Sequence, residues 1–239
     1  MTRTLFASMI AAGLAVCAVP ASAATMNYRA ILSDLNGTGA SGRVDLRHDT
    51  DAQTLSVRVQ ASNLAPDMTH VQHIHGVVGG NSVTPPPAAD TDGDGFIELL
   101  EGVPFYGPIM LSLTDDTVPG LGGFPTAPNG RIDFSYTYDL LSSPAYNAGF
   151  GIDDLLPLRN REVVIHGAFT NFALEDNLGG GLGGGIQNDP SGGPLAAARN
   201  YNAALPVLSG VISPVPLPAT AWLLLAGFGG LAAAARRKA

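Results

Sequence analysis

The sequence predicts an all-β domain, built as an antiparallel Greek-key sandwich or flattened barrel of about eight strands. Two observations support this fold class. Alternating or wholly apolar runs bounded by turn residues recur along the central part of the chain, and helical periodicity is nearly absent there. Runs of this kind form half-buried or buried strands, which pair into packed layers or a closed sheet.

The expected strands follow this alternation. Arg131 to Tyr138 alternates most regularly, and the turn pair Asn129-Gly130 directly precedes it. The other candidates are, in chain order, Met26 to Ser33, Gly42 to Arg47, Thr54 to Ala61, Val71 to Gly76, Ile109 to Leu113, Val163 to Phe169 and Leu205 to Ile212. Two longer connections cover residues 80–107 and 177–194, and the second contains a glycine-rich stretch that is typical of flexible segments.

The first long connection contains a run with the spacing of an EF-hand-type calcium loop. Such a loop needs oxygen ligands at positions 1, 3 and 5, a main-chain carbonyl at 7, a water-bridging group at 9 and a bidentate carboxylate at 12. These positions hold Asp90, Asp92, Asp94, Phe96, Glu98 and Glu101, and Gly95 stands at the sharp turn of position 6. Because Pro85 to Pro87 occupy the place of an incoming helix, we expect a lone loop. The fold prediction therefore includes a calcium-loop insertion; the alternative is an acidic turn that binds no ion.

Three of the five histidines lie in the segment His70 to Gly76. Side chains two apart on a strand share a face, so His73 and His75 point the same way and His70 has the opposite parity. Far downstream, His166 lies in an apolar run, where an unpartnered imidazole is costly. Two imidazoles on one face at this spacing can converge on one metal ion, and His166 either joins His73 and His75 there or bridges to a carbonyl. The alternative is a set of core histidines that are hydrogen-bonded to carbonyls and aspartates.

The start of the chain has the features of a secretory signal peptide. Arg3 supplies a positive charge, an apolar run covers Leu5 to Val19, and Ala21-Ser22-Ala23 is a small-residue cleavage site. A lipoprotein interpretation through Cys17 fits poorly, because Val16 stands where a small residue is expected. We expect residues 1–23 to be removed and a single domain to cover residues 24–213.

The end of the chain has three parts. Val215-Pro216-Leu217-Pro218-Ala219 precedes the apolar stretch Thr220 to Ala235, and a basic terminus follows at Arg236 to Lys238. We expect this terminus to hold the apolar stretch across the inner membrane with the tail on the inner side. This end closely resembles the PEP-CTERM class of sorting tails, which implies a Gram-negative bacterium and an exosortase-type enzyme that removes the helix. We assign residues 214–239 to a sorting tail with a transmembrane segment; the alternative is a plain C-terminal membrane anchor.

Charge and cysteine content limit the partners. Without the two ends, 8 basic residues stand against 20 acidic ones, a net charge of −12. Nucleic acid is therefore not an expected partner. The only cysteine lies in the signal peptide, so we expect no disulfide in the exported domain.

The two histidine segments resemble parts of known families. The segment from His70 to Gly76 looks like the His-x-x-His-x-His segment of copper/zinc superoxide dismutases, and Arg161 to His166 looks like their later strand. That resemblance implies copper ligation by His73, His75 and His166 and a structural role for His70. Residues 28–113 also resemble CHRD domains. The only remaining histidine, His48, precedes the motif, so the dismutase zinc site is not reproduced.

Two functions follow as hypotheses. The first is an exported, surface-sorted metal-binding β domain that holds calcium in its acidic loop and copper or zinc at its three histidines, in the setting of the cell surface or the extracellular polymer matrix. The second is a copper-dependent oxidoreductase of superoxide dismutase type. The acidic surface counts against the second, because it would repel superoxide.

Overall fold

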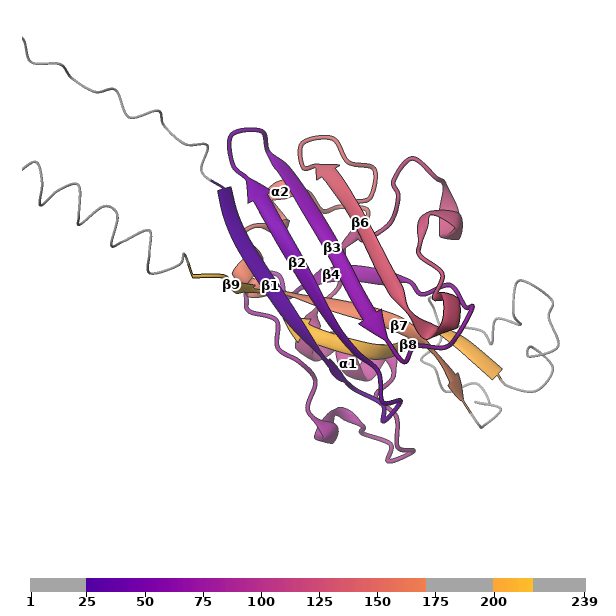
Figure 1. Ribbon diagram of the computed structural model, residues 1–239. Coiled ribbons are helices and arrows are strands. Elements are labelled where there is room, and N and C mark those ends of the chain that lie inside the picture. The colour runs from indigo at the N-terminus through magenta and orange to yellow at the C-terminus, as the bar shows by residue number, and fades with distance from the viewer. Residues whose placement is uncertain (1–24, 171–199, 217–239) are drawn as a thin grey trace, which may run out of the picture.

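The computed structural model describes residues 25–170 and 200–216, and this part of the chain is mostly β (Figure 1). The predicted signal peptide, the glycine-rich stretch at residues 179–185 and the predicted membrane segment at residues 220–235 lie outside the described residues. The strands are β1 (Thr25–Asp34), β2 (Ser41–Asp49), β3 (Thr54–Ser62), β4 (Gln72–Gly76), β5 (Ile109–Ser112), β6 (Ile132–Asp139), β7 (Arg161–Thr170), β8 (Asn200–Val211) and β9 (Ser213–Pro214). Each of the predicted strands is therefore present, with ends shifted by a few residues.

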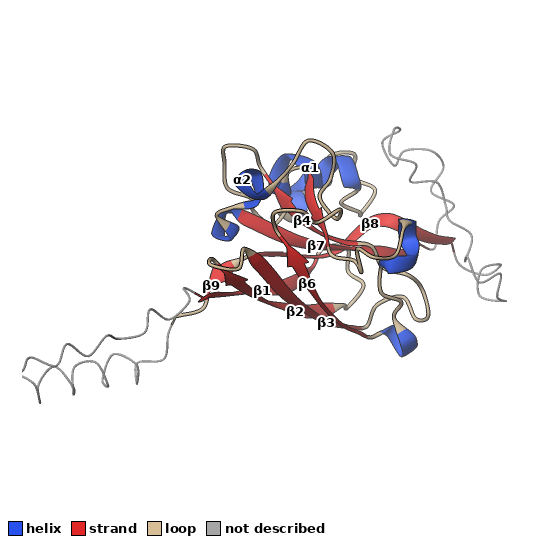
Figure 2. Ribbon diagram, turned by 90° about the horizontal axis from the view of Figure 1, so that it is seen from above, coloured by secondary structure: helices blue, strands red, loops and turns tan. Residues whose placement is uncertain are grey.

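The strands form one curled antiparallel sheet. Its order is β5-β4-β7-β8-β1-β2-β3-β6, and the short β9 pairs with β1. Seen from above, β4, β7 and β8 lie in one layer and β1, β2, β3 and β6 lie in the other (Figure 2). The sheet thus has the shape of a half-barrel with two facing layers, which confirms the predicted all-β fold class.

The hydrophobic core lies between these two layers. Along β3, Leu55, Val57 and Val59 are buried, whereas Arg58 between them is exposed, so the strand alternates as a half-buried strand should. The same core cluster includes Ile74 from β4 and Ile165 from β7. Alternate residues of β4 and of β7 therefore face opposite sides of the sheet. Ile74 and Ile165 face the core, and the residues next to them in each strand face away from it.

Short helices lie in the connections, and the sequence pattern did not predict them. The helices are α1 (Leu99–Tyr106) and α2 (Ile152–Leu155), with 3₁₀ helices η1 (Pro87–Ala89), η2 (Gly120–Gly123), η3 (Pro128–Gly130) and η4 (Leu158–Asn160). In α1, Gly102 and Pro104 are weak helix formers, so the local sequence does not indicate a helix. One hydrogen bond compensates at its start: the Glu101 side chain accepts from the backbone N–H of Glu98.

The connection from β4 to β5 returns over the outer face of β4 and β7. The Ser82 hydroxyl donates to the carbonyl of Tyr106, and the Thr84 hydroxyl donates to the buried carboxylate of Glu162 on β7. The ring of Tyr106 packs against His75 on β4. Residues 77–108 thereby cover the face of the sheet that points away from the core.

Within the described part of the chain, none of the helices has the length and apolar character that crossing a bilayer requires.

Candidate metal centre

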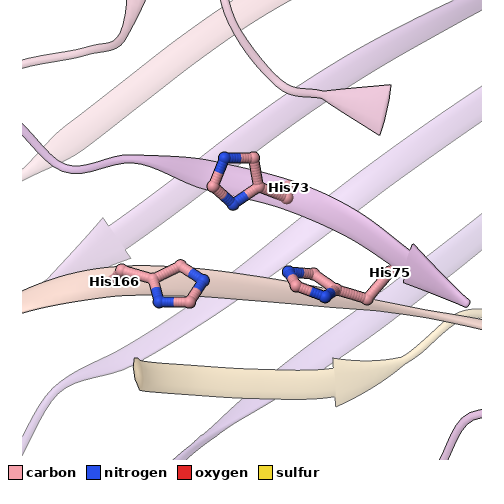
Figure 3. A group of neighbouring side chains, drawn as sticks. All are labelled: His73, His75 and His166. Atoms are coloured by element: carbon pink, nitrogen blue, oxygen red, sulfur yellow. The ribbon is translucent and has the colours of Figure 1, made fainter. Parts of the chain in front are cut away.

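Three histidines from two neighbouring strands meet on the covered face of the sheet. His73 and His75 are two residues apart on β4, and His166 lies on the adjacent strand β7 (Figure 3). The register pairs His73 with Val164, so His166 follows two residues later on the same face of β7. The predicted strand parity places His73 and His75 on one face, and the register between β4 and β7 brings His166 to them.

The three imidazole rings are in mutual contact distance. Ring centroids are 5.6 Å apart for His73 and His75, 5.3 Å for His73 and His166, and 5.9 Å for His75 and His166. One nitrogen from each ring lies within 4.8 Å of the other two. Figure 3 shows one nitrogen of each ring directed into the space between the three rings.

Backbone carbonyls fix two of the rings. Nδ1 of His75 donates to the carbonyl of Gly107 at 2.9 Å, and Nδ1 of His166 donates to the carbonyl of Ala204 at 2.8 Å. A carbonyl can only accept, so the proton of each neutral ring is assigned to Nδ1 and the lone pair to Nε2. This is the arrangement in which metal-binding histidines are usually held.

Three buried ring nitrogens in this group of histidines have no hydrogen-bond partner among the described residues. They are Nδ1 of His73, Nε2 of His75 and Nε2 of His166, one from each ring, and all three are buried. The side chains are 8%, 1% and 2% exposed, respectively. A buried polar atom without a partner costs about 1–3 kcal/mol, so three such atoms directed at one point need an explanation. A bound cation would provide it.

Burial also keeps these rings neutral. Desolvation lowers the pKa of His75 to about 3 and that of His166 to about 4, and it lowers the pKa of His73 well below its ordinary value. Repulsion from the neighbouring rings is a second, smaller cause of the lowered pKa of His73 and of His75. At neutral pH each ring therefore presents a free lone pair, which is the form that binds metal ions.

Several groups around the centre were not predicted from the sequence. Tyr106 packs edge-on against His75 with centroids 4.7 Å apart, and Phe124 does so against His73 at 5.6 Å. Glu162 is the cross-strand partner of His75; it is fully buried, and burial raises its pKa. Its Oε1 accepts from two hydroxyls, whereas Oε2 has no partner among the described residues. The sequence signal that could have indicated Glu162 is its position directly before a buried apolar run.

The other two histidines lie apart from this group. Nδ1 of His70 lies 2.9 Å from the carbonyl of His166, and its Nε2 lies 3.0 Å from the carbonyl of Ala65. Burial lowers the pKa of His70, so its neutral ring donates to one of these two carbonyls and holds the backbone beside the centre. His48 is buried on β2, in the other layer.

The acidic loop precedes and enters α1. Ligand oxygens come within 4.8 Å of one another in two overlapping groups: Asp90, Asp92 and Asp94, and Asp92, Glu98 and Glu101. The predicted turn residue, Gly95, has φ +94°, which favours glycine. Phe96, predicted to offer its carbonyl, donates its backbone N–H to Asp94 at 2.8 Å. The predicted ligand side chains therefore lie close together, although they form two groups.

In the second group, Asp92, Glu98 and Glu101, carboxyl groups lie close enough to shift each other's pKa. Glu98 is only 4% exposed, and burial together with Glu101 and Asp94 raises its pKa to about 8. Burial opposes the ionisation of Glu101 as well, but hydrogen bonds from Glu98 and Thr91 outweigh it and lower its pKa to about 2. One carboxyl of the pair is thus held protonated beside an ionised neighbour.

Comparison with known proteins identifies the tail. The model of the PEP-CTERM protein-sorting motif matches residues 214–238. No curated protein matches the chain. The molecule is therefore a mostly β protein that is exported, anchored transiently in the membrane through its C-terminal tail and sorted by an exosortase-type enzyme.

Proposed function

We propose that this protein is an exported metal-binding β domain that holds one copper or zinc ion at His73, His75 and His166. The observation that carries the proposal is the set of three buried ring nitrogens, one per histidine, that have no partner among the described residues and lie around one point. Its setting after sorting is the cell surface or the extracellular polymer matrix.

The donor set favours copper or zinc over harder cations. Imidazole nitrogen suits zinc and copper, and a site with three protein ligands leaves one position open for water or another small molecule. Copper binds more tightly than zinc to a given set of nitrogen ligands, so availability in the exported compartment decides which ion is found. Binding would replace three unsatisfied contacts by metal bonds and so stabilise the fold.

Metal content tests this proposal. The full chain, produced with its own leader and tail and purified after export, is analysed by mass spectrometry beside the double variant His73→Ala/His75→Ala and the loop variant Asp90→Ala. We expect copper or zinc near one per chain in the wild type and in Asp90→Ala, and none in the histidine variant. Equal transition-metal content in all three, with circular dichroism showing that each is folded, would overturn the proposal.

A second ion, calcium, is proposed for the acidic loop. The twelve-residue spacing and the two carboxylate groups with oxygens within 4.8 Å of one another support it. The affinity expected of an extracellular module is modest, with Kd on the order of 10⁻⁴ to 10⁻³ M. Calcium would also displace the proton held by Glu98, because a ligand carboxylate must be ionised.

The calcium proposal is tested by thermal unfolding with and without calcium. A concentration about ten times Kd stabilises the fold by about 1.4 kcal/mol, a shift of roughly 3–6 °C for a domain of this size. Asp90→Ala should lose this shift, whereas Asp51→Ala, an exposed aspartate in the β2–β3 turn, should keep it. Equal melting temperatures of wild type with and without calcium would contradict the loop's proposed role.

Copper-dependent dismutation is the second candidate function. A three-imidazole centre with an open position favours it, because such a centre can bind a small anion while the metal changes oxidation state. The lack of a fourth histidine counts against this activity. The cluster contains three of the five histidines, and the other two, His48 and His70, lie outside it. A superoxide assay on the copper-loaded chain that gives no more than the rate of free copper would exclude this activity.

A further inference from the structure

The side chain of Asn36, in the turn between β1 and β2, joins two distant parts of the chain. Its Nδ2 donates to the carbonyl of Pro206 at 2.7 Å and to that of Ile97 at 3.1 Å, and its Oδ1 accepts from the N–H of Ile97 at 2.7 Å. Ile97 lies in the acidic loop and Pro206 lies on β8. One amide thereby ties this loop to the strand that lies beside the histidine centre.

At this point β8 departs from its regular pairing with β7. The register shifts between Ile165 and His166 and again between His166 and Ala168. Pro206, the partner of His166, has no N–H to donate to the ladder. The carbonyls of Pro206 and Val207 accept instead from Asn36 and from the N–H of Leu35. The turn after β1 therefore adds hydrogen bonds to a segment of β8 whose pairing with β7 is irregular.

That same segment orients one histidine of the centre. Ala204 lies two residues before Pro206, and its carbonyl accepts the proton on Nδ1 of His166 at 2.8 Å. The direction of this carbonyl decides where the unpartnered Nε2 of His166 points. A shift of the segment would turn the ring away from His73 and His75.

We propose that Asn36 is a positioning residue of the histidine centre: by holding Pro206 against Ile97, it fixes the Ala204 carbonyl that directs Nε2 of His166 toward the metal. This inference rests on the proposed metal site. It also implies that the acidic loop and the histidine centre share one scaffold, although no side chain belongs to both.

Three variants of the full exported chain test the proposal. Asn36→Ala removes all three hydrogen bonds. Asn36→Asp keeps an acceptor for the N–H of Ile97 but cannot donate to Pro206, because an ionised carboxylate only accepts. Thr38→Ala is the matched control in the same turn: it removes one hydrogen bond to Asp34 and one from Ala40 without touching β8.

The readouts are zinc affinity, by competition with a chromophoric chelator, and the visible spectrum of the cobalt-substituted chain, which reports ligand geometry. We expect Asn36→Ala to weaken zinc binding about tenfold, the lower end of the effect of groups outside the ligand shell, and to change the cobalt spectrum. Asn36→Asp should weaken binding to a similar extent, and Thr38→Ala should match the wild type in both readouts.

Other results would overturn the proposal. Zinc affinity of Asn36→Ala within twofold of the wild type would do so, as would an equal loss in Thr38→Ala, which would show a general effect of stability. Wild-type affinity in Asn36→Asp would show that the contact with Pro206 has no role. A wild-type chain that binds no zinc would instead overturn the metal centre, and this inference with it.

Discussion

Replacing His73 by phenylalanine separates the stability of the fold from metal binding. Among the described residues, the ring of His73 makes aromatic contacts but no hydrogen bond, and its buried Nδ1 has no partner. Phenylalanine has a similar shape, keeps an edge-on contact with Phe124 and carries no nitrogen. His73→Phe should therefore make the metal-free protein more stable while removing one metal ligand.

The expected size follows from the buried nitrogen. An unsatisfied buried polar atom costs about 1–3 kcal/mol, which corresponds to a rise of roughly 2–12 °C in Tm for a domain of this size. Zinc at about one hundred times Kd should stabilise the wild type by about 2.7 kcal/mol and leave His73→Phe unchanged. Adding zinc should thus reduce the difference between the two melting temperatures or reverse its sign.

Calorimetry on both proteins, stripped of metal and then loaded with zinc at constant calcium, measures these shifts. His48→Phe is the control, because its Nε2 is also buried without a partner but lies on β2, away from the centre. It should respond to zinc as the wild type does. A loss of more than about 1 kcal/mol in metal-free His73→Phe, or a retained response to zinc, would refute the reasoning.

Three further predictions concern the same scaffold. Metal-free protein should lose stability as the pH falls from about 6.5 toward 4, because unfolded histidines take up protons that buried His75 and His166 do not. Each of these two histidines contributes a slope of about 1.4 kcal/mol per pH unit in urea unfolding, and Glu98, with its pKa raised from 4.5 to about 8, offsets one such slope in the upper part of this range. Gly107→Ala should weaken zinc binding about tenfold in chelator competition, because its Cβ would lie 2.3 Å from the carbonyl oxygen of Gly76 and would displace the acceptor of His75. Calcium should raise zinc affinity about fivefold in the wild type but not in Asp90→Ala, because the acidic loop leads directly into α1, whose C-cap residue is Gly107.

Each of these has an outcome that would contradict it. A free energy of unfolding that does not fall between pH 6.5 and pH 4 would contradict the first prediction. Wild-type zinc affinity in Gly107→Ala would show that the carbonyl does not orient the ring. Identical zinc affinity with and without calcium, in a chain shown to bind both ions, would show that the two sites are independent.

The strands could be predicted because their periodicity is a property of the sequence alone. Arg131 to Tyr138 alternates and becomes β6, with ends one residue away. The shared face of His73 and His75 follows from the same period of two. That His166 joins them depends on the register between β4 and β7, which is a long-range feature, and the family resemblance suggested it.

The remaining features could not be predicted because they depend on the backbone of distant segments. The carbonyls of Gly107 and Ala204 orient two of the rings, and no side-chain pattern marks them. Asn36 acts through turns that meet only in the folded sheet. The helix α1 was missed because Gly102 and Pro104 lower its local helix propensity more than the Glu101 contact at its start raises it.

The central claim is that three imidazoles bind one metal ion, and X-ray absorption spectroscopy at the metal edge tests it most directly. The copper- or zinc-loaded exported chain should show three imidazole nitrogens at about 2.0–2.1 Å. His166→Gln should reduce the imidazole count to two. A first shell of oxygen ligands, or an unchanged count in His166→Gln, would contradict the claim and would place the ion elsewhere on the molecule.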